Sequence, residues 1–311
     1  MNLAGSLLLA VVGGLGATEV LAARREARAA KLTPPYGQDV EIEGGRVHVV
    51  VLGESGPDLV LIHGASGNTR DFTFRLAGDL AKRFRVFVVD RPGLGWSDPH
   101  PKGDGLEAQA RVIAQAVATL GATRPIVLGQ SYGGAVALTW AATRPDSLSA
   151  LVSVSGVAYP WPTGLGAYYT ILSHPLGQAL VIPLLTAWVP RAIIKREIDK
   201  VFAPQEAPTG YDEHFGPELT IRRGQMRVNA RQRRDLLGEI ERLSPRWRDI
   251  DVPIEAIHGD ADHVVHHGIH AERLGAENPN AMITILPGIG HMPHHVSQEA
   301  VIAAVERAAL R

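Results

Sequence analysis

One serine in this 311-residue sequence stands in a pattern that suits a nucleophile. Ser131 lies in the segment Gly129-Gln130-Ser131-Tyr132-Gly133-Gly134, which follows a short apolar run and precedes a stretch of small residues. The pattern G-x-S-x-G in this context predicts a strand, a sharp turn and a helix. Glycines two positions on either side of the serine remove side chains that would clash in so tight a turn. The helix N-terminus directs partial positive charge toward any oxyanion that forms beside the serine.

A serine nucleophile needs a base to take its proton and an acid to orient that base. Two segments late in the chain offer these groups. The apolar run 254–257 leads into Asp260 and Asp262, and the run 282–286 leads into His291. Both segments leave the carboxyl ends of predicted strands, where an open α/β sheet builds its site. We therefore expect His291 to be the base, with either aspartate as its acid.

The strands that must position these residues are short, continuous apolar runs rich in β-branched residues. Such runs suit parallel strands buried on both faces. Helical stretches at 106–120 and 135–143 alternate with them, which predicts an α/β fold with a mostly parallel sheet. The predicted strands are 47–52, 59–62, 85–89, 125–128, 151–154, 254–257 and 282–286.

The strand pattern is interrupted between residues 158 and 247. This segment is rich in proline and carries amphipathic helical patches, so we expect an inserted helical cap. We predict an N-terminal anchor with a basic flank at residues 1–30 and a first part of the core at 38–157. The cap is predicted at 158–247 and the second part of the core at 248–311.

The N-terminal segment differs from the rest of the chain. Residues 3–23 hold a single charge, Glu19, and are long enough for a spanning helix. Four basic residues follow within 24–31, which by the positive-inside rule would keep the catalytic part in the cytoplasm. We expect an uncleaved single-pass membrane anchor. A cleaved signal peptide lacks the basic start it would need, and a helix of the globular part is the third interpretation.

Together these segments resemble the α/β-hydrolase superfamily, in its serine-nucleophile branch of esterases, haloperoxidase-like enzymes and carbon–carbon bond hydrolases. An apolar anchor before such a domain resembles some bacterial members. The resemblance covers residues 40–311 and rests on five blocks in the expected order, namely 63–67, 90–98, the segment around Ser131, 259–262 and 290–293. It implies that Asp262 is the acid. It also implies that the backbone N–H groups of Ala65 and Tyr132 form an oxyanion hole.

The resemblance also narrows the chemistry. Haloalkane dehalogenases and epoxide hydrolases of this fold use an aspartate where this chain has Ser131, so those activities are not expected. The HGGG-type oxyanion motif of many lipases is absent, because Ala65 and Ser66 follow His63-Gly64. The expected function is a serine esterase of the α/β-hydrolase fold that acts on a small acyl or ester substrate, including lipid-like ones. A carbon–carbon bond hydrolase and a non-catalytic binding or signalling protein are the alternatives.

Several other features bound the function. The net charge of −1 gives no basic field for nucleic acid, and the absence of cysteine excludes thiolate metal sites. We expect neither metal nor organic cofactor, although histidines at 263, 266, 267 and 270 have metal-like spacing. We expect His294 and His295 to be solvated or to support the site from outside it. Trp161 and Trp188 of the cap are candidates to line an acyl pocket.

Overall fold

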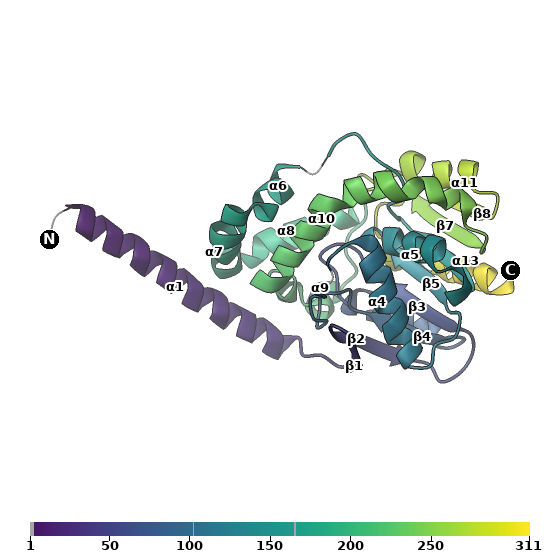
Figure 1. The fold of residues 1–311 in the computed structure, drawn as a ribbon, viewed down its shortest axis with the longest axis horizontal. Coiled ribbons are helices and arrows are strands. Elements are labelled where there is room, and N and C mark those ends of the chain that lie inside the picture. The colour runs from purple at the N-terminus through teal and green to yellow at the C-terminus, as the bar shows by residue number, and fades with distance from the viewer. Residues whose placement is uncertain (1–2, 102, 165) are drawn as a thin grey trace.

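The computed structural model describes residues 3–101, 103–164 and 166–311, and the side chains of residues 3–11 lie outside this description. Its centre is an eight-stranded sheet in the order β1-β2-β4-β3-β5-β6-β7-β8 (Figure 1). β1 and β2 are antiparallel to their neighbours, and the strands from β4 to β8 run parallel. The strands are β1 (Gln38–Ile42), β2 (Gly45–Leu52), β3 (Asp58–Ile62), β4 (Arg85–Val89), β5 (Ile126–Gln130), β6 (Ala150–Val154), β7 (Ile254–Gly259) and β8 (Ala281–Leu286).

Each central strand buries side chains on both faces of the sheet. On β3, Val60 and Ile62 face one hydrophobic core, whereas Leu59 and Leu61 face the other. The helices α4 (Leu106–Thr119) and α5 (Tyr132–Thr143) cover the first face, and α3 (Leu76–Leu80) and α13 (Gln298–Leu310) cover the second. The short helices α2 (Arg70–Thr73), α11 (Arg273–Glu277) and α12 (Pro293–Val296) lie in the connections. The prediction of an α/β fold with a mostly parallel sheet is confirmed.

Helices between β6 and β7 form the layer that we call the cap. It comprises α6 (Ala167–Ser173), a π-helical turn (Gly177–Val181), α7 (Ile182–Trp188), α8 (Arg191–Phe202), α9 (Tyr211–Phe215) and α10 (Arg223–Leu243). Leu172, Ile182 and Met226 form a small core inside it. The far end of α10 joins the main core through Leu236 and Ile240, so this helix connects the cap to the sheet (Figure 1).

The N-terminal helix α1 (Leu3–Leu32) packs its second half against the cap. The Trp188 indole N–H donates to Thr18 Oγ1 at 3.3 Å, and the Arg25 guanidinium donates to the carbonyls of Ala187 and Val189. Arg223 of α10 pairs with both Glu19 and Glu26. Glu19 is therefore held by the cap, and the basic residue Arg25 serves as a structural contact.

Among the residues that the structure describes, no single helix is long and apolar enough to cross a membrane. The structure does not show the predicted span 3–23, and residues of this stretch from Thr18 onward contact the cap. The side chains of residues 3–11 in that stretch lie outside the described part of the chain.

Candidate active site

Ser131 occupies a strained turn between β5 and α5. Its φ of +53° and ψ of −116° lie where non-glycine residues rarely occur, at a cost of about 1–3 kcal/mol. The neighbouring strand holds this conformation, because Ser131 N–H donates to Val154 O and Val157 N–H donates to Ser131 O, at 3.0 and 3.1 Å. A Cβ on Gly129 would overlap the Gly133 carbonyl. The glycines are therefore required by the backbone packing, as the sequence predicts.

His291 and Asp262 meet at the carboxyl ends of β7 and β8. The Nδ1 atom of His291 lies 2.7 Å from Asp262 Oδ2, and both residues are buried. The structure thus brings the predicted base into direct contact with one of the two candidate acids. The other candidate, Asp260, is exposed and accepts a hydrogen bond from the Gly288 N–H at 2.6 Å. Asp262 is the aspartate that contacts the histidine.

Several donors surround the Asp262 carboxylate. Oδ1 accepts from the backbone N–H groups of Val264 and Val265 at 2.8 and 2.9 Å, and Oδ2 lies 3.2 Å from His258 Nε2. Burial alone would raise the pKa of Asp262, but hydrogen bonds from His258 and His291 outweigh it and hold that pKa well below its usual 3.8. Asp262 is therefore a carboxylate at neutral pH. His258 is a neighbour of the acid that sequence reasoning missed.

The second ring nitrogen of His291 faces the residue before the serine. Its Nε2 lies 3.3 Å from the side-chain amide nitrogen of Gln130, which also approaches the His291 carbonyl at 3.4 Å. When the His291 Nδ1–H donates to Asp262, Nε2 is unprotonated and its lone pair can accept a hydrogen bond from the Gln130 amide. This tautomer is the one a base requires. The sequence did not predict a role for Gln130, because the pattern G-x-S-x-G allows any residue type at its x positions.

The loop after β3 approaches the serine from the other side. A Cβ placed on Gly64 would lie 3.1 Å from the Ser131 Cβ, so the next residue, Ala65, follows directly beside the candidate nucleophile. Tyr132 is the first residue of α5, where backbone N–H groups have no partner within the helix. Of the two residues predicted to form an oxyanion hole, Tyr132 thus follows Ser131 in the chain, and Ala65 belongs to the loop that approaches Ser131 in space.

A buried arginine connects these two segments. Arg91 donates from Nε to the His63 carbonyl and from Nη2 to the Gly64 carbonyl, each at 3.0 Å. Its guanidinium carbon also lies 4.2 Å from the centre of the Tyr132 ring. Burial lowers the pKa of Arg91 to about 10, so it stays charged at neutral pH. Arg91 thereby fixes the loop before Ala65 relative to the start of α5.

His63 completes this support as a neutral group. Its Nδ1 contacts the Gly64 carbonyl at 2.9 Å, and its Nε2 accepts from the Arg91 N–H at 3.0 Å. Complete burial, together with the nearby Arg91, lowers the pKa of His63 to about 4. His63 therefore acts as a structural hydrogen-bonding group in this structure.

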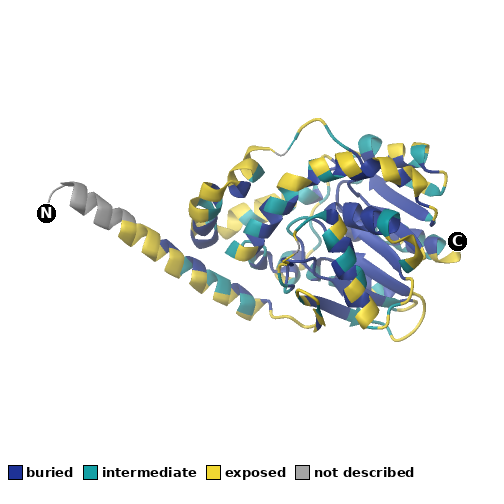
Figure 2. Ribbon diagram, viewed as in Figure 1, coloured by how far each residue is buried: buried dark blue, intermediate teal, exposed yellow. Residues whose placement is uncertain are grey.

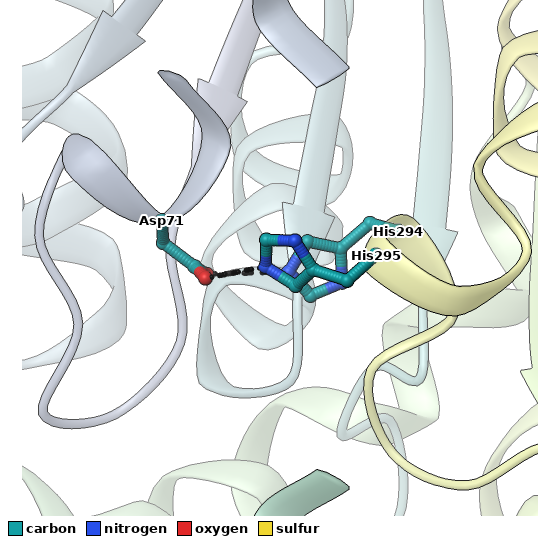
Figure 3. Close-up of side chains that lie close together, drawn as sticks. All are labelled: Asp71, His294 and His295. Carbon is teal, nitrogen blue, oxygen red and sulfur yellow. Dashed lines mark hydrogen bonds and ion pairs between the residues drawn. The ribbon is translucent and has the colours of Figure 1, made fainter. Parts of the chain in front are cut away.

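His294 and His295 are buried rather than solvated. Both rings point toward Asp71 of α2, with Nε2 atoms at 3.3 and 2.8 Å from its carboxylate oxygens (Figure 3). The Tyr211 hydroxyl donates to the same carboxylate at 2.8 Å. Burial would raise the pKa of Asp71, but the two histidines hold it well below its usual value. This cluster links the segment after His291 to the segment after the Ala65 loop.

The same three side chains form the one group in the described residues with metal-like spacing. Their ligand atoms lie within 4.8 Å of one another. Each histidine Nε2 already has the carboxylate as its partner, and Tyr211 occupies a further position on that carboxylate. The carboxylate holds each ring through its Nε2 atom, whereas the Nδ1 atoms of both histidines are buried without a hydrogen-bond partner. Because these contacts join α2, α9 and α12, we assign the cluster a structural role.

The histidines with metal-like spacing in the sequence do not assemble as a set. His270 is buried and its Nδ1 accepts from the backbone N–H groups of Ala158 and Tyr159, each at 3.1 Å. Burial lowers the pKa of His270 to about 3. The rings of His266 and His267 stack on each other 4.8 Å apart. These contacts give the histidines structural roles in the chain after Asp262.

The two tryptophans predicted to line an acyl pocket lie in different surroundings. Trp161 is half-buried against the main core, with its ring 6.3 Å from that of His270. Trp188 is 58% exposed on the outer side of the cap, next to Thr18 of α1. A role for either residue in substrate binding stays a prediction.

Comparisons with known proteins were made on sequence and on structure. The model of a family described as alpha/beta hydrolase fold matches residues 57–298. The polyketide synthase ThaQ of Burkholderia thailandensis is 30% identical over 95% of this chain, which spans 14% of that protein's length. Haloalkane dehalogenase 2 of Mycobacterium tuberculosis is 28% identical over 84% of this chain and 90% of its own. An esterase from Exiguobacterium antarcticum has the same fold, with a TM-score of 0.72, 19% identity, and coverage of 89% of this chain and 100% of its own.

Proposed function

The chain belongs to the alpha/beta hydrolase fold family, and on this premise we propose that it is a serine hydrolase that cleaves carboxylic esters. The observation that carries the proposal is the 2.7 Å contact between His291 Nδ1 and the buried Asp262 carboxylate, placed at the same sheet edge as Ser131. A buried carboxylate that orients a histidine, at the same sheet edge as a serine in a strained turn, suits the activation of a hydroxyl nucleophile.

The proposed reaction has two halves. Ser131 Oγ attacks the ester carbonyl carbon while His291 Nε2 takes the hydroxyl proton, and the Asp262 carboxylate stabilises the imidazolium that forms. The C–O bond to the alcohol then breaks, and His291 returns the proton to the leaving oxygen. Water attacks the acyl-enzyme with His291 again as the base, which releases the carboxylic acid and restores Ser131.

Charge on the carbonyl oxygen is stabilised by backbone donors in this proposal. The N–H groups of Ala65 and Tyr132 supply the oxyanion hole, and a donor of this kind is worth about 10²–10³-fold in turnover. Arg91 is the positioning residue, because it binds the carbonyls before Ala65 and stacks on the Tyr132 ring. A serine nucleophile separates this proposal from the dehalogenase activity named for one relative, whose branch uses an aspartate at that position.

The proposal is tested with p-nitrophenyl esters of increasing acyl length. The wild-type protein should hydrolyse at least the short esters, and Ser131→Ala should lose about 10⁴-fold or more of the turnover. Ser155→Ala is the matched control, because Ser155 is also buried with a positive φ, at the end of the neighbouring strand. Near-wild-type hydrolysis by a folded Ser131→Ala protein would sink the proposal.

We also propose that the N-terminal segment attaches the enzyme to a membrane. The support is the apolar sequence of residues 3–17 and the four basic residues within 24–31. Because residues 3–17 are too short to span the bilayer, attachment by partial insertion fits them better than a full crossing. The full-length chain should sediment with membranes in high salt. Its recovery in the soluble fraction, with Met1 intact, would contradict this attachment.

A further inference from the structure

The surface formed by α6, α7 and the turn between them is unusually apolar for an exposed surface. From Ser147 to Pro190 the sequence contains no Asp, Glu, Lys or Arg. Many residues of α6, α7 and the turn between them are coloured as exposed in Figure 2. Several of these exposed residues are large and hydrophobic. We call this set the outer cap face; it consists of Tyr168, Ile171, Leu176, Leu180, Leu184 and Trp188, each between 45% and 64% exposed.

Packing inside the cap does not account for these side chains. The cap has its own buried core, in which Leu172 and Ile182 face inward from α6 and α7. The outer cap face lies on the opposite side of the same helices. Several large exposed apolar side chains on neighbouring helices are typical of a binding surface in a folded protein.

Helix α1 extends this surface. It passes beside α7, where Trp188 bonds Thr18, and it then continues beyond the cap (Figure 1). Among its described side chains, Val12, Leu15 and Val20 are also exposed. The apolar residues of α1 and of the outer cap face therefore gather at one end of the molecule, away from β8 and α13.

Three features select a lipid surface as the occupant. Helix α1 has an apolar sequence over residues 3–17, which suits hydrocarbon better than a protein groove. Trp188 and Tyr168 are the aromatic types that favour the headgroup level of a bilayer. Arg24 and Arg28 are exposed on α1 just beyond the apolar part, where they would meet anionic headgroups.

The two segments of the outer cap face are bent sharply against each other. The segment Ala167–Ser173 meets the segment Gly177–Trp188 at 91°, and each is too short to traverse a bilayer. Two short apolar helices at this angle suit a position in the plane of the interface.

We propose that the outer cap face and the exposed apolar side chains of α1 dock together into the surface of a bilayer containing anionic lipid. This proposal rests on the proposed function. The docking sets the substrate class, because an ester dissolved in the bilayer would then lie next to the cap and could enter the enzyme directly from the membrane. The enzyme would act on membrane-borne esters in preference to those free in water.

The absence of cysteine in the chain permits a direct test. Single cysteines are introduced in the full chain as Leu180→Cys and Leu184→Cys and labelled with an environment-sensitive nitrobenzoxadiazole probe. Matched controls are Met282→Cys and Leu310→Cys, which are exposed hydrophobic positions on β8 and at the end of α13. Vesicles of phosphatidylcholine and phosphatidylglycerol should shift the emission of the cap probes to the blue, while the control probes should not change.

Two outcomes would overturn the docking. Cap probes that remain in water while the protein sediments with vesicles would show that α1 alone tethers the chain. A blue shift without vesicles that grows with protein concentration would show that a second copy covers the face.

The substrate class has a separate readout. Leu180→Asp with Leu184→Asp should lower the hydrolysis of a vesicle-borne ester severalfold and leave that of a water-soluble short ester unchanged. Equal loss on both esters would contradict the link between docking and substrate. Absence of any Ser131-dependent hydrolysis would refute the proposed function, whereas the probe emission would still decide the docking.

Discussion

The substitution Asp262→Asn tests the proposed acid through the hydrogen bonds around it. The Oδ1 atom accepts from two backbone donors, Val264 N–H at 2.8 Å and Val265 N–H at 2.9 Å. An asparagine must keep its carbonyl oxygen on that side, because its NH₂ group cannot accept a hydrogen bond. Its NH₂ group then faces His291 Nδ1, which must become an acceptor.

The consequence is a change of tautomer. With Nδ1 accepting, the proton of neutral His291 moves to Nε2, and the ring can no longer take the proton of Ser131. In a Ser-His-Asp triad this substitution lowers turnover by about 10⁴-fold, or about 5 kcal/mol in the activation free energy. The assay is steady-state hydrolysis of a short p-nitrophenyl ester, with circular dichroism to verify the fold.

Asp260→Asn provides the matched control. Asp260 is exposed, and an asparagine carbonyl could keep its hydrogen bond from the Gly288 N–H. We expect turnover within a few-fold of wild type for this variant. A larger loss for Asp260→Asn than for Asp262→Asn would show that the acid is assigned wrongly, and small losses for both would refute the triad.

Three further substitutions probe the supporting contacts. Arg91→Lys should lower kcat by about 10–10²-fold with little change in KM, because a lysine cannot both bind the two carbonyls and stack on Tyr132. An equal change in kcat and KM would contradict the positioning role of Arg91. Asp71→Asn should lower the free energy of unfolding by about 3 kcal/mol in denaturant titrations, since it leaves His294 and His295 without their buried carboxylate, and a loss within error would refute the structural role. The folded pKa of His63, about 4, lies below its usual 6.5, so the unfolded chain binds more protons between these values and stability falls as pH falls. His63 should therefore contribute a loss of about 2 kcal/mol between pH 7 and pH 5. His63→Gln should reduce this pH dependence, and an unchanged slope would contradict it.

Local sequence patterns were sufficient to predict the buried strands and the turn at Ser131. Apolar runs such as 59–62 and 85–89 are buried on both faces, so nothing in tertiary packing competes with their β propensity. The turn at Ser131 needs glycines at fixed offsets, and this need is visible in the sequence. The edge strand β1 was missed because only Val40 within it is fully buried, which leaves a weak pattern.

Long-range contacts could not be predicted in the same way. Asp71 precedes His294 by 223 positions, and no local pattern shows that these residues meet. The contacts of Thr18 and Glu19 with the cap were missed for a related reason, because hydropathy does not register long-range contacts. The choice between Asp260 and Asp262 rested on resemblance, and it is the fold that distinguishes an exposed carboxylate from a buried one.

The central claim, that Ser131 is an activated nucleophile, is tested most directly by covalent labelling. The full-length protein is treated with a fluorophosphonate probe, and the modified peptide is identified by mass spectrometry. We expect one label on Ser131, no label on the Ser131→Ala protein, and strongly slowed labelling of the His291→Ala protein. A wild-type protein that is folded but unlabelled, or a label on another residue that persists in Ser131→Ala, would contradict this claim.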